Sequence, residues 1–139
     1  MKKVVIIGAG TGGTIIANKL AKKTKGMAEI TIIDPTFRHP YQPGVLFTMF
    51  KYQSTASMIK DGSKMIPKSV NQVKDSVTKV DTDKKVVETA SSGNFDYDYL
   101  VLGTGARYAP ETAEWWDDSI YEFYTPKGAD KTAEALEKF

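Results

Sequence analysis

The sequence predicts an α/β fold: a mostly parallel sheet with helices, plus a small antiparallel β-meander. Two observations support this prediction. Residues 4–7 form a short apolar run that is unbroken rather than alternating, as expected for a strand buried on both faces of a parallel sheet, and residues 30–33 and 99–102 are predicted to be further buried strands. After residue 72 the pattern changes to short strands separated by turns, which is typical of antiparallel pairing.

The composition is that of a soluble globular domain of 139 residues, with 41% hydrophobic and 26% charged residues. The net charge of +2 gives no reason to expect a nucleic acid or an acidic surface as partner. The chain has no cysteine, which excludes a disulfide, a thiolate zinc site and a cysteine nucleophile within it. No histidine and carboxylate cluster has ligand spacing, so we expect no metal site. Without a signal peptide or a membrane-spanning run, the expected location is the cytoplasm.

The first part of the chain predicts a compact βαβ unit. A glycine cluster follows the first apolar run at once, and residues 14–25 form a helical pattern with apolar residues on one side and lysines on the other. Gly26 is a suitable helix stop. The second strand ends at Asp34-Pro35, and the crossover should be right-handed.

The remaining elements are less regular. Between residues 36 and 67 only 45–52 has the pattern of a short helix, and long irregular segments of this kind are often functional. Strands of the meander are expected over residues 73–80, 85–89 and 95–98. A last helix should begin at about Pro126, with Thr125 as its cap.

The glycine cluster matches the pattern G-x-G-x-x-G through Gly8, Gly10 and Gly13. Gly8 permits a tight turn out of the strand, Gly10 lets the backbone approach a pyrophosphate, and Gly13 lets the helix pack closely on the strand. The helix N-terminus offers free N–H groups and the positive end of its dipole to phosphate oxygens. We therefore expect a dinucleotide at this loop, which also contains Thr11 and Gly12.

Asp34 lies 21 residues after Gly13 (34 minus 13), close to the spacing expected for a carboxylate that binds ribose. Its two oxygens can accept both ribose hydroxyls, which favours an unphosphorylated ribose. The alternative is a generic turn and a solvated strand end, although strand, loop, helix and acid all follow the order that a dinucleotide site requires. The loop does not by itself choose between FAD and NAD.

A resemblance to a known family comes from two further segments. Residues 95–106, Phe-Asp-Tyr-Asp-Tyr-Leu-Val-Leu-Gly-Thr-Gly-Ala, resemble the second flavin fingerprint of the two-dinucleotide-binding flavoproteins. His39-Pro40-Tyr41-Gln42-Pro43 and the stretch from Trp115-Trp116 to Tyr124-Thr125-Pro126-Lys127-Gly128-Ala129 resemble the sulfide:quinone oxidoreductases within that superfamily. The resemblance extends over nearly all 139 residues. The flavin motifs are specific for the superfamily, and the Tyr-Gln-Pro segment is moderately specific for the family.

The resemblance implies a Rossmann-like FAD-binding domain with FAD as its cofactor. The glycine loop and Asp34 would hold the pyrophosphate and ribose, the segment after the acid would lie near the isoalloxazine, and the second fingerprint would line the flavin. Val77 would border the adenine side, by its position in the meander. The implied cofactor-binding residues are Gly8, Gly10, Thr11, Gly12, Gly13, Asp34, Pro35, Gln42, Pro43, Val77, Thr104, Gly105 and Ala106. No catalytic residue is assigned.

Two departures from the family matter. Its members use cysteines to take up sulfide, whereas this chain has none and carries Tyr124 where some members have such a cysteine. Members are also far longer, with a second dinucleotide fold, a returning FAD segment and C-terminal membrane-binding helices. We therefore expect residues 1–139 to be an N-terminal FAD-binding portion that is inactive in isolation.

In the parent protein, sulfide and a quinone would be the partners, and peripheral membrane association would come only through the C-terminal part. The oligomeric state stays open. One alternative is a fragment of a type II NADH:quinone dehydrogenase, whose segment after the acid is usually built differently. Another is a non-catalytic module that keeps FAD or NAD as a structural ligand or sensor.

Overall fold

The computed structural model describes residues 1–117 and 119–139, and the chain forms two compact units. The first unit comprises Met1–His39 and Asp61–Gly105, and the second comprises Pro40–Lys60 and Ala106–Phe139. Between the two units the chain runs through the short strands β3 (Arg38–Pro40) and β4 (Ile59–Asp61), which pair with each other. Within the described residues, the structure has no helix with the length and apolar character needed to cross a membrane.

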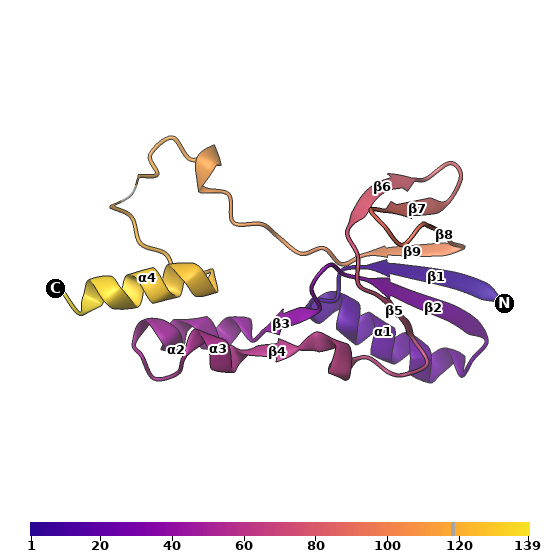
Figure 1. Ribbon diagram of the computed structural model, residues 1–139, viewed down its shortest axis with the longest axis horizontal. Helices are drawn as coiled ribbons and strands as arrows, with labels where there is room; N and C mark the ends of the chain where they lie inside the picture. The colour runs from indigo at the N-terminus through magenta and orange to yellow at the C-terminus, as the bar shows by residue number, and fades with distance from the viewer. Residues whose placement is uncertain (118) are drawn as a thin grey trace. The chain divides into compact units, whose positions relative to one another are not determined.

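The first unit is built on a four-stranded sheet of order β5-β2-β1-β9 in which every pair is parallel (Figure 1). Its strands are β1 (Lys2–Ile7), β2 (Ala28–Ile33), β5 (Asn71–Val73) and β9 (Tyr99–Leu102). Helix α1 (Thr11–Thr24) connects β1 to β2 and confirms the predicted βαβ unit. The helix begins at Thr11 rather than Thr14, because Gly10 already has the extended backbone of an N-cap.

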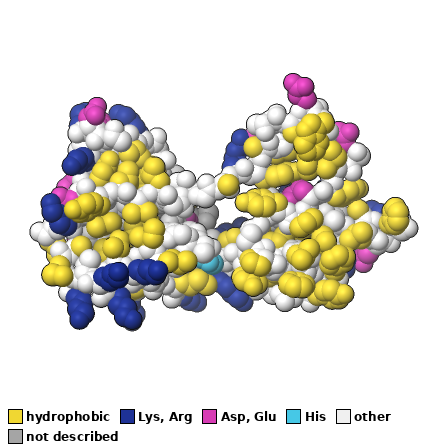
Figure 2. All heavy atoms as spheres, turned by 180° about the vertical axis from the view of Figure 1, so that it is seen from behind, with side chains coloured by type: hydrophobic (Ala, Val, Ile, Leu, Met, Phe, Trp, Pro, Cys, Tyr) yellow, Lys and Arg dark blue, Asp and Glu magenta, His cyan; other side chains and the backbone are white. Residues whose placement is uncertain are grey.

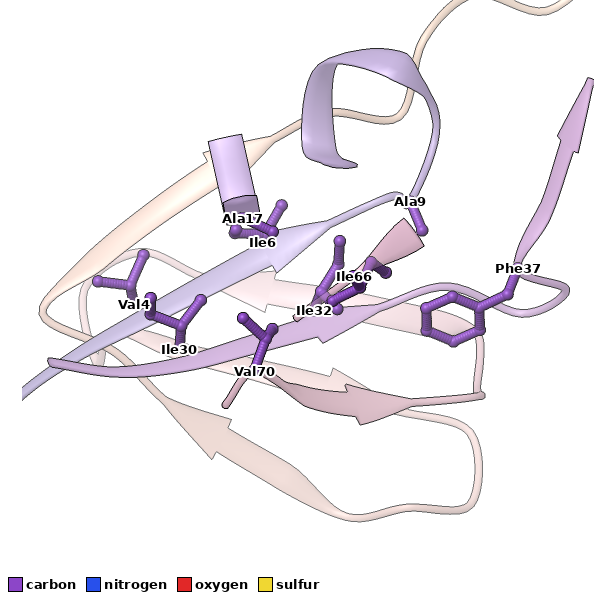
Figure 3. Packing of buried hydrophobic residues seen from close by; sticks show 9 residues of the cluster. All are labelled: Val4, Ile6, Ala9, Ala17, Ile30, Ile32, Phe37, Ile66 and Val70. Carbon is purple, nitrogen blue, oxygen red and sulfur yellow. The ribbon is translucent and has the colours of Figure 1, made fainter. Parts of the chain in front are cut away.

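The central strands β1 and β2 are buried on both faces, which explains their apolar character. The expectation that residues 99–102 are buried in the same way was wrong, because β9 lies at the edge of the sheet and leaves Tyr99 and Leu102 exposed. On one face, Val4 and Ile6 of β1 pack with Ala17 of α1 in a cluster that Figure 3 shows. On the other face, Val5 and Ile7 pack with Val87 of the meander. The alternation follows from the period of two along a strand, and it fixes the register of β1 between its two layers.

The antiparallel β-meander is confirmed, with strands β6 (Val77–Asp81), β7 (Val86–Thr89) and β8 (Asn94–Asp96). The prediction of one strand over residues 73–80 was wrong. The chain breaks after Val73, since β5 belongs to the parallel sheet, where it pairs with β2. Asp75 lies in the break and is buried, and its carboxylate accepts backbone N–H groups of Ser76, Ser91 and Ser92 at 2.8, 2.8 and 2.6 Å.

The second unit is helical. It contains α2 (Val45–Met49), α3 (Thr55–Met58) and α4 (Pro126–Leu136), with 3-10 turns over Gln42–Gly44 and Pro110–Thr112. Its core consists of Val45, Met58 and Ala129. The helix predicted over residues 45–52 ends earlier, at Met49, and α3 was not predicted because it spans a single turn. The predicted cap of α4 is confirmed: the Thr125 hydroxyl accepts the Gly128 N–H at 2.9 Å.

Candidate functional site

Three glycines from three elements meet at the carboxyl end of β1. Gly8 has a φ of +96°, its N–H donates to the Ile33 carbonyl at 2.8 Å, and a Cβ on it would lie 2.5 Å from the Gly103 carbonyl oxygen. A Cβ on Gly13 would overlap the carbonyl oxygen of Gly8, so α1 begins in direct backbone contact with the loop. Only hydrogen at these positions permits the approach, which is the packing role expected for Gly8 and Gly13.

Gly10 and Gly12 have the opposite surroundings. A Cβ built on either residue would meet no atom within 4 Å, so the outer side of the loop is open. Gly10 is the N-cap of α1, and no side chain caps the helix. The N–H groups of the first turn and the positive end of the helix dipole are therefore available to an anionic ligand at this opening.

Asp34 ties the glycine loop to the end of β2. Its Oδ2 accepts the Ala9 N–H at 2.9 Å, while Oδ1 accepts the Thr36 N–H, the Thr36 hydroxyl and the Phe37 N–H at 2.9, 3.2 and 2.7 Å. Partial burial raises the pKa of Asp34, but the backbone donors outweigh it, so the pKa lies below its ordinary value. The group is an ionised acceptor, and Oδ2 keeps one lone-pair direction for a ligand hydroxyl.

The carbonyl group of Ala9 also holds the glycine loop in place, and the sequence did not predict this role. The Thr14 hydroxyl donates to the Ala9 carbonyl oxygen at 2.9 Å in a buried hydrogen bond, and Nδ1 of His39 lies 3.4 Å from the same oxygen. Ala9 itself is only 1% exposed. A threonine in the first turn of the helix, directly after the glycine pattern, was the available signal, because its hydroxyl can reach back to the loop backbone.

The second fingerprint reaches the same edge of the sheet. β9 pairs with β1 so that Leu102 lies opposite Ile7, and the Gly103 N–H donates to the Ile7 carbonyl at 2.8 Å. Thr104 and Gly105 follow directly and are exposed, with Gly105 at a φ of +71°. The carboxyl ends of parallel strands are where ligands bind in open α/β sheets, so both fingerprints lie at the expected edge.

Five predicted residues remain to be located: Pro35, Gln42, Pro43, Val77 and Ala106. Pro35 is exposed directly after Asp34, and Val77 begins β6 and packs against the cluster that contains Val87. Gln42, Pro43 and Ala106 belong to the second unit, where the Gln42 amide donates to the Tyr124 carbonyl. The roles of these five residues in binding a cofactor stay predictions of the sequence.

Comparison with known proteins gives matches at three levels. The family model described as "Pyridine nucleotide-disulphide oxidoreductase" matches residues 2–115. The chain is 39% identical over 103 residues to the mitochondrial sulfide:quinone oxidoreductase of Dictyostelium discoideum, covering 74% of this chain and 23% of that protein. It is 35% identical over 113 residues to a type II NADH:quinone oxidoreductase of Staphylococcus aureus, covering 75% of this chain and 26% of that protein.

Among solved structures, the sulfide:quinone oxidoreductase of Aquifex aeolicus superposes with a TM-score of 0.76 at 22% identity, covering 99% of this chain and 32% of that one. This likeness confirms the predicted fold. The chain thus spans less than a third of the length of each of these relatives. The resemblance to the N-terminal portion of sulfide:quinone oxidoreductases, inferred from residues 39–43 and 115–129, is confirmed by these matches. With a glycine loop, an acid and a second fingerprint at one sheet edge, and a family model that matches 2–115, this chain belongs to the pyridine nucleotide-disulphide oxidoreductase family.

Proposed function

We propose that this chain binds FAD, with the pyrophosphate at the glycine loop and the adenosine ribose at Asp34. The observation that carries the proposal is the contrast within the loop: Gly8 and Gly13 are closed by backbone contacts, whereas Gly10 and Gly12 face open space at an uncapped helix N-terminus. Such an opening suits a pyrophosphate, because backbone N–H groups and the helix dipole attract negative charge and no Cβ obstructs it.

The acid at the end of β2 favours a ribose without a phosphate. Asp34 is ionised and half-buried, and its remaining acceptor direction on Oδ2 can take one ribose hydroxyl. A 2′-phosphate at the same place would meet a fixed negative charge. The N–H groups of the glycine loop and the carboxylate of Asp34 together therefore fit the ADP half of FAD or NAD. FAD is preferred because Thr104 and Gly105 form a second fingerprint at the same edge.

For the whole protein we propose the oxidation of sulfide with transfer of electrons through FAD to a quinone. The support is the 39% identity with a sulfide:quinone oxidoreductase. FAD, when bound, supplies the two-electron redox chemistry, and the residues of this chain bind and orient it. Sulfide capture by a thiol cannot take place within these 139 residues, which contain no cysteine. The isolated chain should therefore be inactive, and residues 1–139 would act as an FAD-binding domain.

A second candidate is a portion of a type II NADH:quinone oxidoreductase, favoured by the 35% identity over 113 residues. The sequence of a longer parent gene would distinguish the two, because two well-placed cysteines beyond a second glycine fingerprint favour sulfide. A non-catalytic FAD- or NAD-binding module is the third reading, and it would fit a chain that functions at this length.

The experiment that tests FAD binding is a visible spectrum of the purified chain after incubation with FAD and gel filtration. We expect the flavin absorption band to elute with the protein. Loss of the band together with saturable binding of NAD would assign the loop to NAD instead. Loss of both would show that these residues do not form a dinucleotide site by themselves. Sulfide-dependent quinone reduction by the pure chain would contradict the proposed inactivity.

A further inference from the structure

The lysines of the first unit are segregated rather than spread over it. Residues 1–28 and 62–74 contain no aspartate or glutamate, although they include nine lysines in all. The outward side of α1 presents Lys19, Lys22 and Lys23, which are exposed, while Thr14 and Ala17 on the opposite side are buried. The spacings from Lys19 are three and four residues, so these side chains share one helix face. The small net charge of the chain conceals this local excess.

A neighbouring loop extends the positive surface. The Asn18 amide donates to the Met65 carbonyl at 2.9 Å, which holds the loop after the 3-10 turn Gly62–Met65 beside α1. A groove of about 480 Å³ lies between them, lined by Asn18, Lys19, Ala21, Lys22, Pro67 and Ser69. Lys68 is exposed in that loop. We call Lys19, Lys22, Lys23, Lys25 and Lys68 the basic face. In Figure 2, basic side chains gather along the lower edge of this unit, on the left of the view.

None of the five lysines takes part in an ion pair within residues 1–117 and 119–139. The lysines at the opposite end of the unit differ in this respect. Lys79 pairs with Glu88 and Lys84 pairs with Asp81, at 3.5 and 3.7 Å. Uncompensated positive charge is therefore a property of the α1 side, where it can attract an anionic surface.

Exposed apolar side chains accompany the basic face. Ile15 precedes Lys19 by one helical turn on the same side and is 49% exposed, and Met27 follows α1 and is 72% exposed. Apolar side chains among lysines can enter the boundary between lipid headgroups and acyl chains. They gain nothing from a phosphodiester backbone, and this face has no arginine, the residue suited to bidentate phosphate and base recognition. A lipid surface therefore fits these side chains better than a nucleic acid does.

From these observations we propose that the basic face docks on an anionic membrane surface. Ile15 and Met27 enter the interface, and the five lysines interact with the lipid headgroups without a specific partner for each. This contact differs from the sequence-based expectation that membrane association comes only through a C-terminal part. It goes beyond the proposed function and does not depend on FAD binding, since the face lies on the outward side of α1 and the glycine loop at its N-terminus.

The test is cosedimentation of the purified chain with vesicles of phosphatidylcholine alone and of phosphatidylcholine mixed with phosphatidylglycerol. We expect partition to the anionic vesicles only. It should be lost when salt is raised from about 0.1 to about 1 M, because the screening length falls from about 10 to about 3 Å. The triple variant Lys19→Gln, Lys22→Gln, Lys23→Gln should bind about 100-fold more weakly, at about fivefold per lysine.

The matched control is Lys79→Gln, Lys84→Gln, Lys85→Gln, which removes the same charge from exposed positions of the meander. It should bind vesicles nearly as well as the unchanged chain. Equal losses in both triple variants would overturn the proposal, because net charge rather than the basic face would then account for binding. Binding to a duplex oligonucleotide without partition to anionic vesicles would also overturn it. Circular dichroism checks folding, which should persist because glutamine and lysine have similar helix propensities.

Discussion

The Oδ2 atom of Asp34 accepts the backbone N–H of Ala9 at 2.9 Å, so the acid at the end of β2 holds the glycine loop that follows β1. The other oxygen of the same carboxylate accepts the N–H groups of Thr36 and Phe37. Asp34, which is proposed to bind ribose, thus also stabilises the loop that is proposed to bind pyrophosphate. Dinucleotide affinity and local stability should therefore depend on the same side chain.

Asp34→Asn should lower both properties. An asparagine has one acceptor oxygen, and its NH₂ group would face backbone donors that the carboxylate now satisfies. We expect the free energy of unfolding to fall by about 1–3 kcal/mol, the cost of leaving such donors unpaired, and FAD affinity to fall as well. Urea denaturation and a flavin titration measure the two effects. Asp83→Asn, in the exposed turn between β6 and β7, is the control that should change neither.

Gly10→Val should abolish FAD binding while leaving the fold intact. Gly10 has extended backbone angles, φ −68° and ψ −169°, and its Cβ would meet no atom within 4 Å. The valine side chain would instead occupy the space needed by a pyrophosphate. Flavin retention through gel filtration and the thermal unfolding midpoint are the measurements. Unchanged affinity would show that the pyrophosphate does not lie at this loop.

Gly13→Ala, in contrast to Gly10→Val, should lower the stability of the fold itself. Its methyl group would overlap the carbonyl oxygen of Gly8, so β1 and α1 would have to separate. We expect destabilisation by about 1–3 kcal/mol, the usual cost of overpacking, visible in the urea midpoint of the chain without any ligand. If Gly13→Ala were as stable as the unchanged chain, the close contact between Gly13 and Gly8 would be refuted.

Asp75→Asn should remove a contribution to the free energy of unfolding that depends on pH. The backbone N–H of Ser91 and the hydrogen bonds from Ser76 and Ser92 hold the pKa of Asp75 far below its ordinary value, despite the opposing effect of burial. A carboxyl whose pKa is lower in the folded state stabilises above its unfolded pKa of about 3.9 and loses that contribution as pH falls toward the folded pKa.

Asp75→Asn should therefore be less stable than the unchanged chain at pH 7, and the difference should shrink below about pH 4. Urea denaturation across this range measures the difference. A gap that stays constant with pH would mean that the loss comes from geometry rather than from the charge of Asp75. The variant Asp83→Asn again serves as the comparison, since this exposed carboxyl lies in a turn of the same meander.

Thr125→Ala should destabilise the second unit by about 1 kcal/mol, the typical cost of losing an N-cap. The Thr125 hydroxyl accepts the Gly128 N–H at 2.9 Å and donates to Oε1 of Glu122 at 2.5 Å. Thr125→Ser keeps the hydroxyl and should restore most of the stability. Helix content by circular dichroism and the urea midpoint report the change. An equal loss in both variants would assign the effect to packing of the threonine methyl group.

The sequence by itself determined the strands β1, β2 and β9, the meander, the glycine loop and Asp34. Each of these leaves a local signature: a short, mostly apolar run, a turn, a glycine pattern or an acid at a set spacing. The cap Thr125 was likewise readable, because capping depends on residues adjacent in the chain.

Only the tertiary structure decided the features that depend on distant partners. β5 has three residues and becomes a parallel strand through pairing with β2. The hydrogen bonds of Asp34 to Ala9 and of Asp75 to Ser91 form with backbone N–H groups that folding brings near. The close approach of Gly103 to Gly8 depends on folding in the same way. The lysines of α1 and Lys68 are separate in sequence and form one face because Asn18 holds the loop at Met65. Local pattern fixes which elements form, whereas long-range hydrogen bonds and packing fix which atoms meet.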